Sequence, residues 1–223
     1  MSHSGDQRTE RTLIIIGQVL GPPYLDITAL GQFETWIPEA ENQGFRIRHS
    51  HGITPKGVWA RLDELHERHR WSGVGRRLIP HLDNTLGRPF RRHIQRVDTG
   101  SFLSAGNVAW QQRLLDLYAC QRWKVIGTMH KALEEEFDYL YLTTASSYVN
   151  PRALAELLRE LTLTGIYAGT RMVDAVSGQV FASGANRILS RDVIERIVDR
   201  RVNYENDVME DVGLGRLIEN LGI

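Results

Sequence analysis

Cysteine, lysine and net charge are all scarce in this sequence of 223 residues. Cys120 is the only cysteine, which excludes an intrachain disulfide and a metal site built from a cysteine cluster. Basic and acidic residues number 27 each, so the net charge is zero and no overall positive field attracts nucleic acid. Lysine occurs only at positions 56, 124 and 131. We expect a globular protein of ordinary composition with no nucleic-acid partner.

Long apolar runs are missing as well. No stretch approaches the length needed to cross a bilayer, so we expect no transmembrane segment. Residues 1–11 lack the apolar centre of a signal peptide and are predicted to form a flexible tail. Together these absences predict a soluble, cytoplasmic protein.

Several common site signatures are also absent. The glycine pairs at 73/75 and 213/215 lack the spacing of a dinucleotide-binding fingerprint, and the sequence has no GxxxxGK[ST] phosphate loop. His66 and His69 would share one helix face, but no third ligand lies near them, so a solvated helix face is the better interpretation. No serine stands in a GxSxG turn, which leaves a hydrolase triad without support.

The N-terminal half follows a strand–helix–strand pattern. Residues 12–19 predict a buried parallel strand, residues 26–43 a helix that ends at Gly44, and residues 45–49 a second strand. Beyond this βαβ unit, we expect an irregular surface excursion over 50–92, a short strand at 93–97, and a helical region over 108–136 that is broken or built of two helices.

The C-terminal half has clearer punctuation. A strand at 138–143 leads through "TASSYVN" to a helix at 151–161, with Asn150 as its N-cap. Two strand-like stretches follow, then a helix from Ser190 and a last helix over "VMEDVGLGRLIENLGI". With no linker or repeat, the prediction is one α/β domain over 12–223.

Two local features could carry chemistry. Glu210 and Asp211 are adjacent carboxylates at the start of the last helix, where they act either as simple helix caps or as catalytic groups. Ser183 and Gly184 lie in "FASGANRILSRD", predicted as a strand, a turn of small residues and a helix. Small residues there would let a ligand approach the backbone, although a tight connection would need them too.

Taken together, four blocks of the sequence resemble the β1,3-galactosyltransferase and fringe-type glycosyltransferases, inverting enzymes of the GT-A fold. Those carry D-S-Y-x-N-L-T-x-K-T, then T-D-D-D-x-F-V, then Y-x-S-G-x-G-Y-x-L-S-R-D, then E-D-V-x-x-G. The blocks here are "DLYACQRWK", "LTTASSYVN", "FASGANRILSRD" and "EDVGLG", in the same order and with similar spacing. The matching residues are Asp116, Tyr118 and Lys124; Thr143, Tyr148, Val149 and Asn150; Ser183, Gly184, Leu189, Ser190, Arg191 and Asp192; and Glu210, Asp211, Val212 and Gly215.

The resemblance implies a GT-A-type, Rossmann-like domain with a mostly parallel central sheet flanked by helices. It implies inverting transfer of a sugar from a nucleotide sugar, expected to be a UDP-sugar, to a carbohydrate or other hydroxyl acceptor. Asp211 would be the general base, with Glu210 beside it. The expected donor-binding residues are Lys124, Thr144, Ser146, Ser147, Arg171, Ser183 and Gly184, with Arg187 as a weaker candidate.

One departure from the family pattern changes the expected chemistry. The aspartate cluster that holds a divalent metal in the family becomes Thr144-Ala145-Ser146, so all three carboxylates are lost. Mn²⁺ and Mg²⁺ prefer hard oxygen anions as ligands. We therefore expect no metal cofactor, and leaving-group charge balanced by arginine, lysine and backbone amides.

Two alternatives to this hypothesis stay open. A GT-A-like domain that has lost catalysis and serves as a sugar- or nucleotide-binding or scaffolding protein would also lack the carboxylates. A nucleotidyltransferase shares the general architecture but needs metal-binding carboxylates, and the sequence offers no good pair for them.

Overall fold

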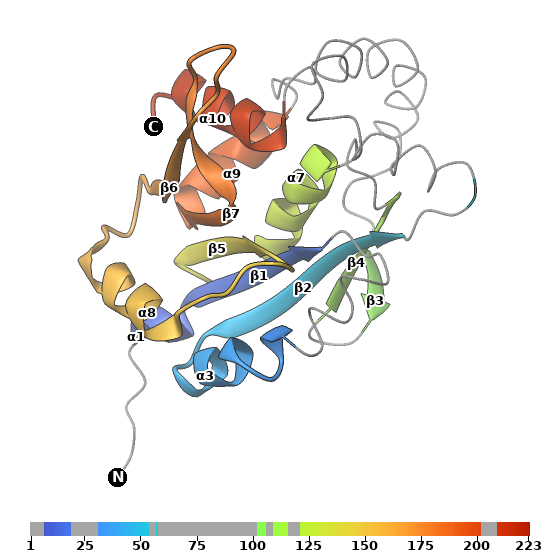
Figure 1. The fold of residues 1–223 in the computed structure, drawn as a ribbon, viewed down its shortest axis with the longest axis vertical. Helices are drawn as coiled ribbons and strands as arrows, with labels where there is room; N and C mark the ends of the chain where they lie inside the picture. Colours follow the sequence, from blue (N-terminus) through green and yellow to red (C-terminus); the bar gives the residue numbers. More distant parts are fainter. Residues whose placement is uncertain are drawn as a thin grey trace.

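The computed structural model describes residues 7–18, 31–53, 57, 102–105, 109–115, 121–201 and 209–223. Within these ranges, one sheet is covered by helices on both faces (Figure 1). The N-terminal helices lie on one face together with the helix that follows the fifth strand, and the remaining helices lie on the other. The α/β architecture is thus confirmed, and the described residues are consistent with a single domain.

Seven strands of the described chain form this sheet, in the order β3-β4-β2-β1-β5-β7-β6. The four central strands run parallel to one another, whereas β3, β7 and β6 pair antiparallel with their neighbours. The sheet is therefore mixed, and the prediction of a mostly parallel sheet holds only for its centre. The bounds are β1 Thr12–Gln18, β2 Arg46–Ile53, β3 Phe102–Ala105, β4 Ala109–Leu115, β5 Tyr139–Thr144, β6 Tyr167–Val173 and β7 Val180–Ser190.

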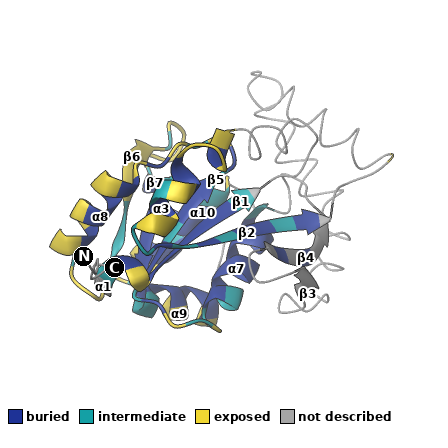
Figure 2. Cartoon of the chain, turned by 90° about the horizontal axis from the view of Figure 1, so that it is seen from below, coloured by how far each residue is buried: buried dark blue, intermediate teal, exposed yellow. Residues whose placement is uncertain are grey.

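The central strand β1 divides its side chains between two cores. Leu13 and Ile15 point to one face and Ile14 and Ile16 to the other, and all four are fully buried. A continuous run of β-branched and aliphatic residues is what a strand covered on both faces requires. Figure 2 shows β1 and β5 buried in the middle of the molecule, with exposed residues on the outer sides of the helices and on the edge strand β6.

The N-terminal βαβ unit is present, with shifted boundaries. Helix α1 (Gln7–Glu10) precedes β1, and Thr9 is buried there, so the packed structure begins before residue 12 and the predicted tail is too long. Helix α3 (Trp36–Asn42) covers only the second half of the predicted 26–43 helix, and residues 19–30 lie outside the described ranges. Gly44 has φ 89°, a left-handed conformation that suits glycine after a helix.

One prediction in the middle of the chain is wrong. Residues 109–115, predicted as helical, form β4, which pairs parallel with β2 and antiparallel with β3. The rest of that region does contain a helix, α7 (Gln121–Ala132). The predicted excursion over 50–92 begins later than expected because β2 extends to Ile53; of residues 54–101, which include the predicted strand at 93–97, the structure describes only Gly57.

In the C-terminal half, the observed helices agree more closely with the predicted ones. Helix α8 (Pro151–Glu160) starts where predicted, and the Asn150 side chain accepts a hydrogen bond from the Ala153 N–H at 3.1 Å. Helices α9 (Arg191–Asp199) and α10 (Glu210–Asn220) complete the described chain. The turn predicted at 183–185 does not exist, because β7 continues as a strand through these residues to Ser190.

Candidate functional site

The candidate site lies where the carboxyl ends of the central parallel strands meet. The chain leaves β1 toward α3 and β2 on one side, and β5 pairs with β1 on the other. The carboxyl ends of β1 and β5 therefore flank a topological switch point, the usual ligand position in open α/β sheets. Gly17 of β1 is in register with Ser50 of β2 and Thr144 of β5, so these three residues lie side by side at this edge.

The turn after β5 is held by hydrogen bonds rather than by charge. The Thr144 hydroxyl lies 2.7 Å from the Ser147 hydroxyl and 3.3 Å from that of Ser146. The Ser147 N–H donates to the Thr144 carbonyl at 3.1 Å. From the segment before α3, the buried Gln32 amide donates to the Thr144, Ala145 and Ser147 carbonyls at 3.1, 2.8 and 3.1 Å. The turn is thus fixed in one conformation from both sides.

A second polar network lies under this edge on the α7 side. The Ser50 and Thr128 hydroxyls are 2.6 Å apart, and the Gln112 amide donates to both, at 3.0 and 2.8 Å. Gln112 also donates to the Lys124 carbonyl at 2.8 Å. All four residues are buried, so this network ties β2, β4 and α7 together and fixes the direction of two hydroxyl groups.

These groups border a small cavity of about 30 Å³. Gly17, Ser50, Lys124, Thr144, Gly184 and Arg187 contribute to its lining. A space of this size holds about two water molecules. The cavity nonetheless brings together three of the predicted donor-binding residues, Lys124, Thr144 and Gly184.

A buried ion pair joins β7 to the start of α10. Both terminal nitrogens of Arg187 donate to the Glu210 carboxylate, at 2.8 and 3.0 Å. The two side chains are 2% and 11% exposed, so water does little to weaken the pair. A bidentate arginine–carboxylate pair also fixes the relative orientation of the two side chains.

Asp211 lies directly beside this pair. Its carboxylate accepts hydrogen bonds from the Gly184 N–H and from its own neighbour Val212, the latter at 3.1 Å. Burial raises the pKa of Asp211, and the negative charge of Glu210 raises it further. Arg187 and the two N–H groups act in the opposite direction. Asp211 is therefore a stronger base than an ordinary aspartate, in a position fixed by backbone amides.

Gly184 brings the backbone of β7 close to all three charged groups. A Cβ atom at this position would lie 3.7 Å from a Glu210 oxygen and 3.8 Å from both an Arg187 nitrogen and an Asp211 oxygen. The adjacent Ser183 hydroxyl accepts a hydrogen bond from the Ala185 N–H at 3.3 Å. The predicted Ser183–Gly184 feature therefore lies beside the predicted carboxylates, on a strand rather than a turn.

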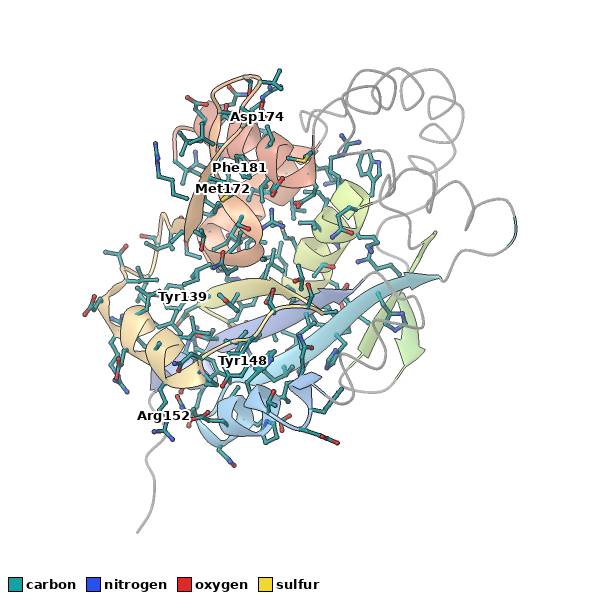
Figure 3. The ribbon with its side chains drawn as sticks, viewed as in Figure 1. Tyr139, Tyr148, Arg152, Met172, Asp174 and Phe181 are labelled. Carbon is teal, nitrogen blue, oxygen red and sulfur yellow. The ribbon has the colours of Figure 1, made fainter. Side chains whose placement is uncertain are left out.

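Arg171 is not brought to this cavity. It lies exposed on β6, in register with Ala182, and lines a separate groove of about 660 Å³ between the β6–β7 hairpin and α10. Figure 3 shows the neighbouring pair Met172 and Phe181 on these strands, away from Tyr148 on the loop after β5. Ser146 and Ser147 stand on the Gln32-bound turn, with Ser146 exposed. Asp116 and Tyr118 of the helix signature lie outside the described residues.

Several residues of the site were not predicted from the sequence. Gln112 and Ser50 sit on β4 and β2, and Gln32 precedes α3. Ser50 had a usable signal, since it follows an alternating strand at a carboxyl end. Gln112 had none, because its segment was predicted as a helix.

Comparisons with known proteins add no assignment. No protein-family profile matches the chain, and no curated protein matches it either. In the ranges that the structure describes, no group of three or more histidine, cysteine, aspartate or glutamate side chains could hold a metal ion. Nor does any helix in the same ranges have the length and apolar character needed to cross a bilayer.

Proposed function

We propose that the protein is an inverting glycosyltransferase of GT-A type that moves a sugar from a nucleotide sugar to a hydroxyl acceptor, with Asp211 as general base. One observation carries the proposal. The carboxylate of Asp211 lies at the carboxyl edge of the central sheet, beside Gly184, with a raised pKa and with the neighbouring Glu210 already paired to Arg187. The site therefore holds one carboxylate poised to accept a proton, next to a backbone that a ligand can approach.

The proposed reaction forms one bond and breaks one. The acceptor oxygen attacks the anomeric carbon from the face opposite the leaving diphosphate, and Asp211 takes the acceptor's hydroxyl proton. The bond between the anomeric carbon and the diphosphate oxygen breaks, and the nucleoside diphosphate leaves with the electron pair. The transition state has oxocarbenium character, as in glycoside hydrolysis.

Balancing the charge of the leaving group falls to this chain's own side chains in the proposal. Lys124 is buried and lines the cavity below Thr144 and Gly184. Arg187 also lines it, although its charge is shared with Glu210. The hydroxyls of Thr144 and Ser147 and the backbone N–H groups of this edge can add hydrogen bonds to phosphate or ribose.

A binding protein without catalysis is the second candidate, and the turn after β5 favours it. The Thr144 hydroxyl is bonded within the turn, and the turn's carbonyls are bonded to Gln32. Because its polar groups already have hydrogen-bond partners within the chain, the turn can have a purely structural role. Such a protein would bind a nucleotide or sugar and leave the donor intact.

Calorimetric titration with UDP, GDP and their sugars, each with EDTA and with Mn²⁺, separates these candidates from one another. The proposal expects binding that EDTA does not weaken, together with transfer or slow hydrolysis of the bound donor. Asp211→Asn should keep the donor affinity and lower turnover by at least about a hundredfold, because a general base contributes about 10²–10⁴ in rate. Undiminished turnover would remove Asp211 from its role, and binding without turnover in the unmodified protein would favour the second candidate. An absolute need for Mn²⁺ would contradict the metal-free form.

A further inference from the structure

We propose that the Arg187–Glu210 pair is the positioning device of the site, which holds the N-terminus of α10 against β7 so that the carboxylate of Asp211 faces the Gly184 N–H. Neither residue needs to touch a substrate for this role. The inference rests on the proposed function only for its effect on turnover, since the geometry around Asp211 can be measured without any reaction.

The position of the Arg187–Glu210 pair in the fold suits this role. Arg187 stands inside β7, in register with Leu142 of β5 and Gly169 of β6, so both neighbouring strands hold its backbone. Glu210 is the first residue of α10. The N-cap residue of α10 is Met209, whose side chain makes no capping hydrogen bond. The bidentate contact therefore supplies the direction that a capping side chain would otherwise give to the first turn.

The two adjacent carboxylates of α10 have different partners. Glu210 accepts both arginine hydrogen bonds, whereas the contacts recorded for Asp211 are the N–H groups of Gly184 and Val212. A Cβ atom placed on Gly184 would lie within 4 Å of the Arg187, Glu210 and Asp211 side chains, so these three groups are close together. A rotation of α10 that broke the ion pair would carry Asp211 away from Gly184 as well.

The charges around Asp211 also suit a positioning role for the pair. The described charged groups that act on Asp211 are Glu210 on its own helix and Arg187 on β7. The same three charged groups also act on the pKa of Tyr167 on β6. Glu210 and Arg187 act on the pKa of Asp211 in opposite directions, and the effect of Glu210, which raises it, is the larger. The pair thus fixes the carboxylate without a direct cation contact that would weaken it as a base.

The test combines four variants with one matched control. Arg187→Met, Arg187→Lys, Glu210→Gln and the double variant Arg187→Met/Glu210→Gln change the pair. Arg48→Met is the control, because Arg48 makes a similar bidentate contact with Glu135, at 2.8 and 3.0 Å, on β2 away from Asp211. The titration of Asp211 is followed by carboxyl ¹³C NMR, with its signal assigned by its loss in Asp211→Asn.

The expected order of the Asp211 titration midpoints follows from the signs above. Arg187→Met should raise the midpoint above that of the unmodified protein, and Glu210→Gln should give the lowest midpoint of the series. The double variant should fall below the unmodified protein and above Glu210→Gln, while Arg48→Met should leave the midpoint unchanged. Arg187→Lys keeps the charge and loses the fork geometry, so kcat should fall by about a hundredfold while KM for the donor changes little.

Two results would overturn the inference. One is an Asp211 midpoint that does not move in folded Arg187→Met or Glu210→Gln, and the other is full kcat in Arg187→Lys. If Arg187→Met does not fold, Glu210→Gln and Arg187→Lys decide the matter alone. If the midpoints follow the expected order but no donor is turned over, the pair keeps its positioning role and the proposed glycosyl transfer fails. If transfer is found and the midpoints do not move, the transfer stands and the inference fails.

Discussion

Gly215 offers the sharpest test of how α10 is held against the sheet. It lies near the middle of α10, and a Cβ atom there would meet the Phe181 Cβ at 2.7 Å and the Val180 carbonyl oxygen at 3.2 Å. Both contacts are with rigid parts of β7, so α10 would have to move outward by several tenths of an ångström. Such overpacking costs about 1–3 kcal/mol.

Helix propensity acts in the opposite direction at the same position. Replacing glycine by alanine inside a helix gains about 1 kcal/mol when nothing obstructs the new methyl group. Taking the upper part of the overpacking range, because neither obstructing atom can swing away, we expect Gly215→Ala to lose about 1–2 kcal/mol of unfolding free energy. For a chain of this length, that corresponds to a melting temperature lower by about 2–8 °C.

Urea unfolding followed by circular dichroism measures this difference directly. Gly31→Ala is the control, because the same methyl group would meet no atom of the described residues within 4 Å and Gly31 does not have a positive φ. Its stability should stay within about 0.5 kcal/mol of the unmodified protein. A Gly215→Ala variant that is as stable as the original, or more stable, would show that propensity outweighs the contact with β7 and would refute the reasoning.

Three further outcomes can be measured on the same material. Burial, and to a lesser degree the charge of His51, lowers the pKa of His49 from 6.5 to about 4. Between these pH values the unfolded chain binds more protons than the folded one, so the free energy of unfolding should rise by about 3 kcal/mol from pH 4 to 6.5. Urea titrations of His49→Gln should show a flatter dependence on pH. The pKa of Asp211 is raised instead, so the unmodified protein should lose stability relative to Asp211→Asn as the pH rises from the ordinary aspartate pKa through the raised value; parallel curves would contradict this. Gly184→Ala adds a methyl group at ordinary contact distances of 3.7–3.8 Å, so the free energy of unfolding should not change. Calorimetry should show an affinity for the donor that is about tenfold weaker. An unchanged affinity would mean that the ligand binds elsewhere.

Local sequence patterns predicted an element correctly where the residues of the element itself carried the information. The apolar run of β1, the Asn150 cap of α8 and the helix predicted from Ser190 all agree with the observed elements. The predictions failed where pairing with distant strands determines the secondary structure. Residues 109–115 have apolar side chains at a spacing that suits a helix, but β2 and β3 offer strand partners on both sides.

The extended form of β7 has a similar cause. Ser183, Gly184 and Ala185 are small residues that favour a turn in isolation, yet β5 and β6 flank this strand on both sides and carry it through. Phe33, within the segment predicted as the 26–43 helix, is 47% exposed and stacks on His49 with ring centres 5.2 Å apart. Of the site, adjacent carboxylates and the Ser183–Gly184 pair could be identified from the sequence. The partner of Glu210 could not, because Arg187 lies 23 residues away and meets it only through the β7–α10 contact.

The turn after β5 limits how this protein could acquire a metal ion. Ala145 is only 4% exposed under the Gln32 amide, so an aspartate at that position would bury a carboxylate among carbonyl oxygens at a cost of several kcal/mol. Ser146 is exposed, and an aspartate there would stay hydrated until an ion arrived. Of these two positions, only 146 could present a new carboxylate to an ion without burying it. An aspartate at position 145 would instead disturb the Gln32 contacts that hold the turn.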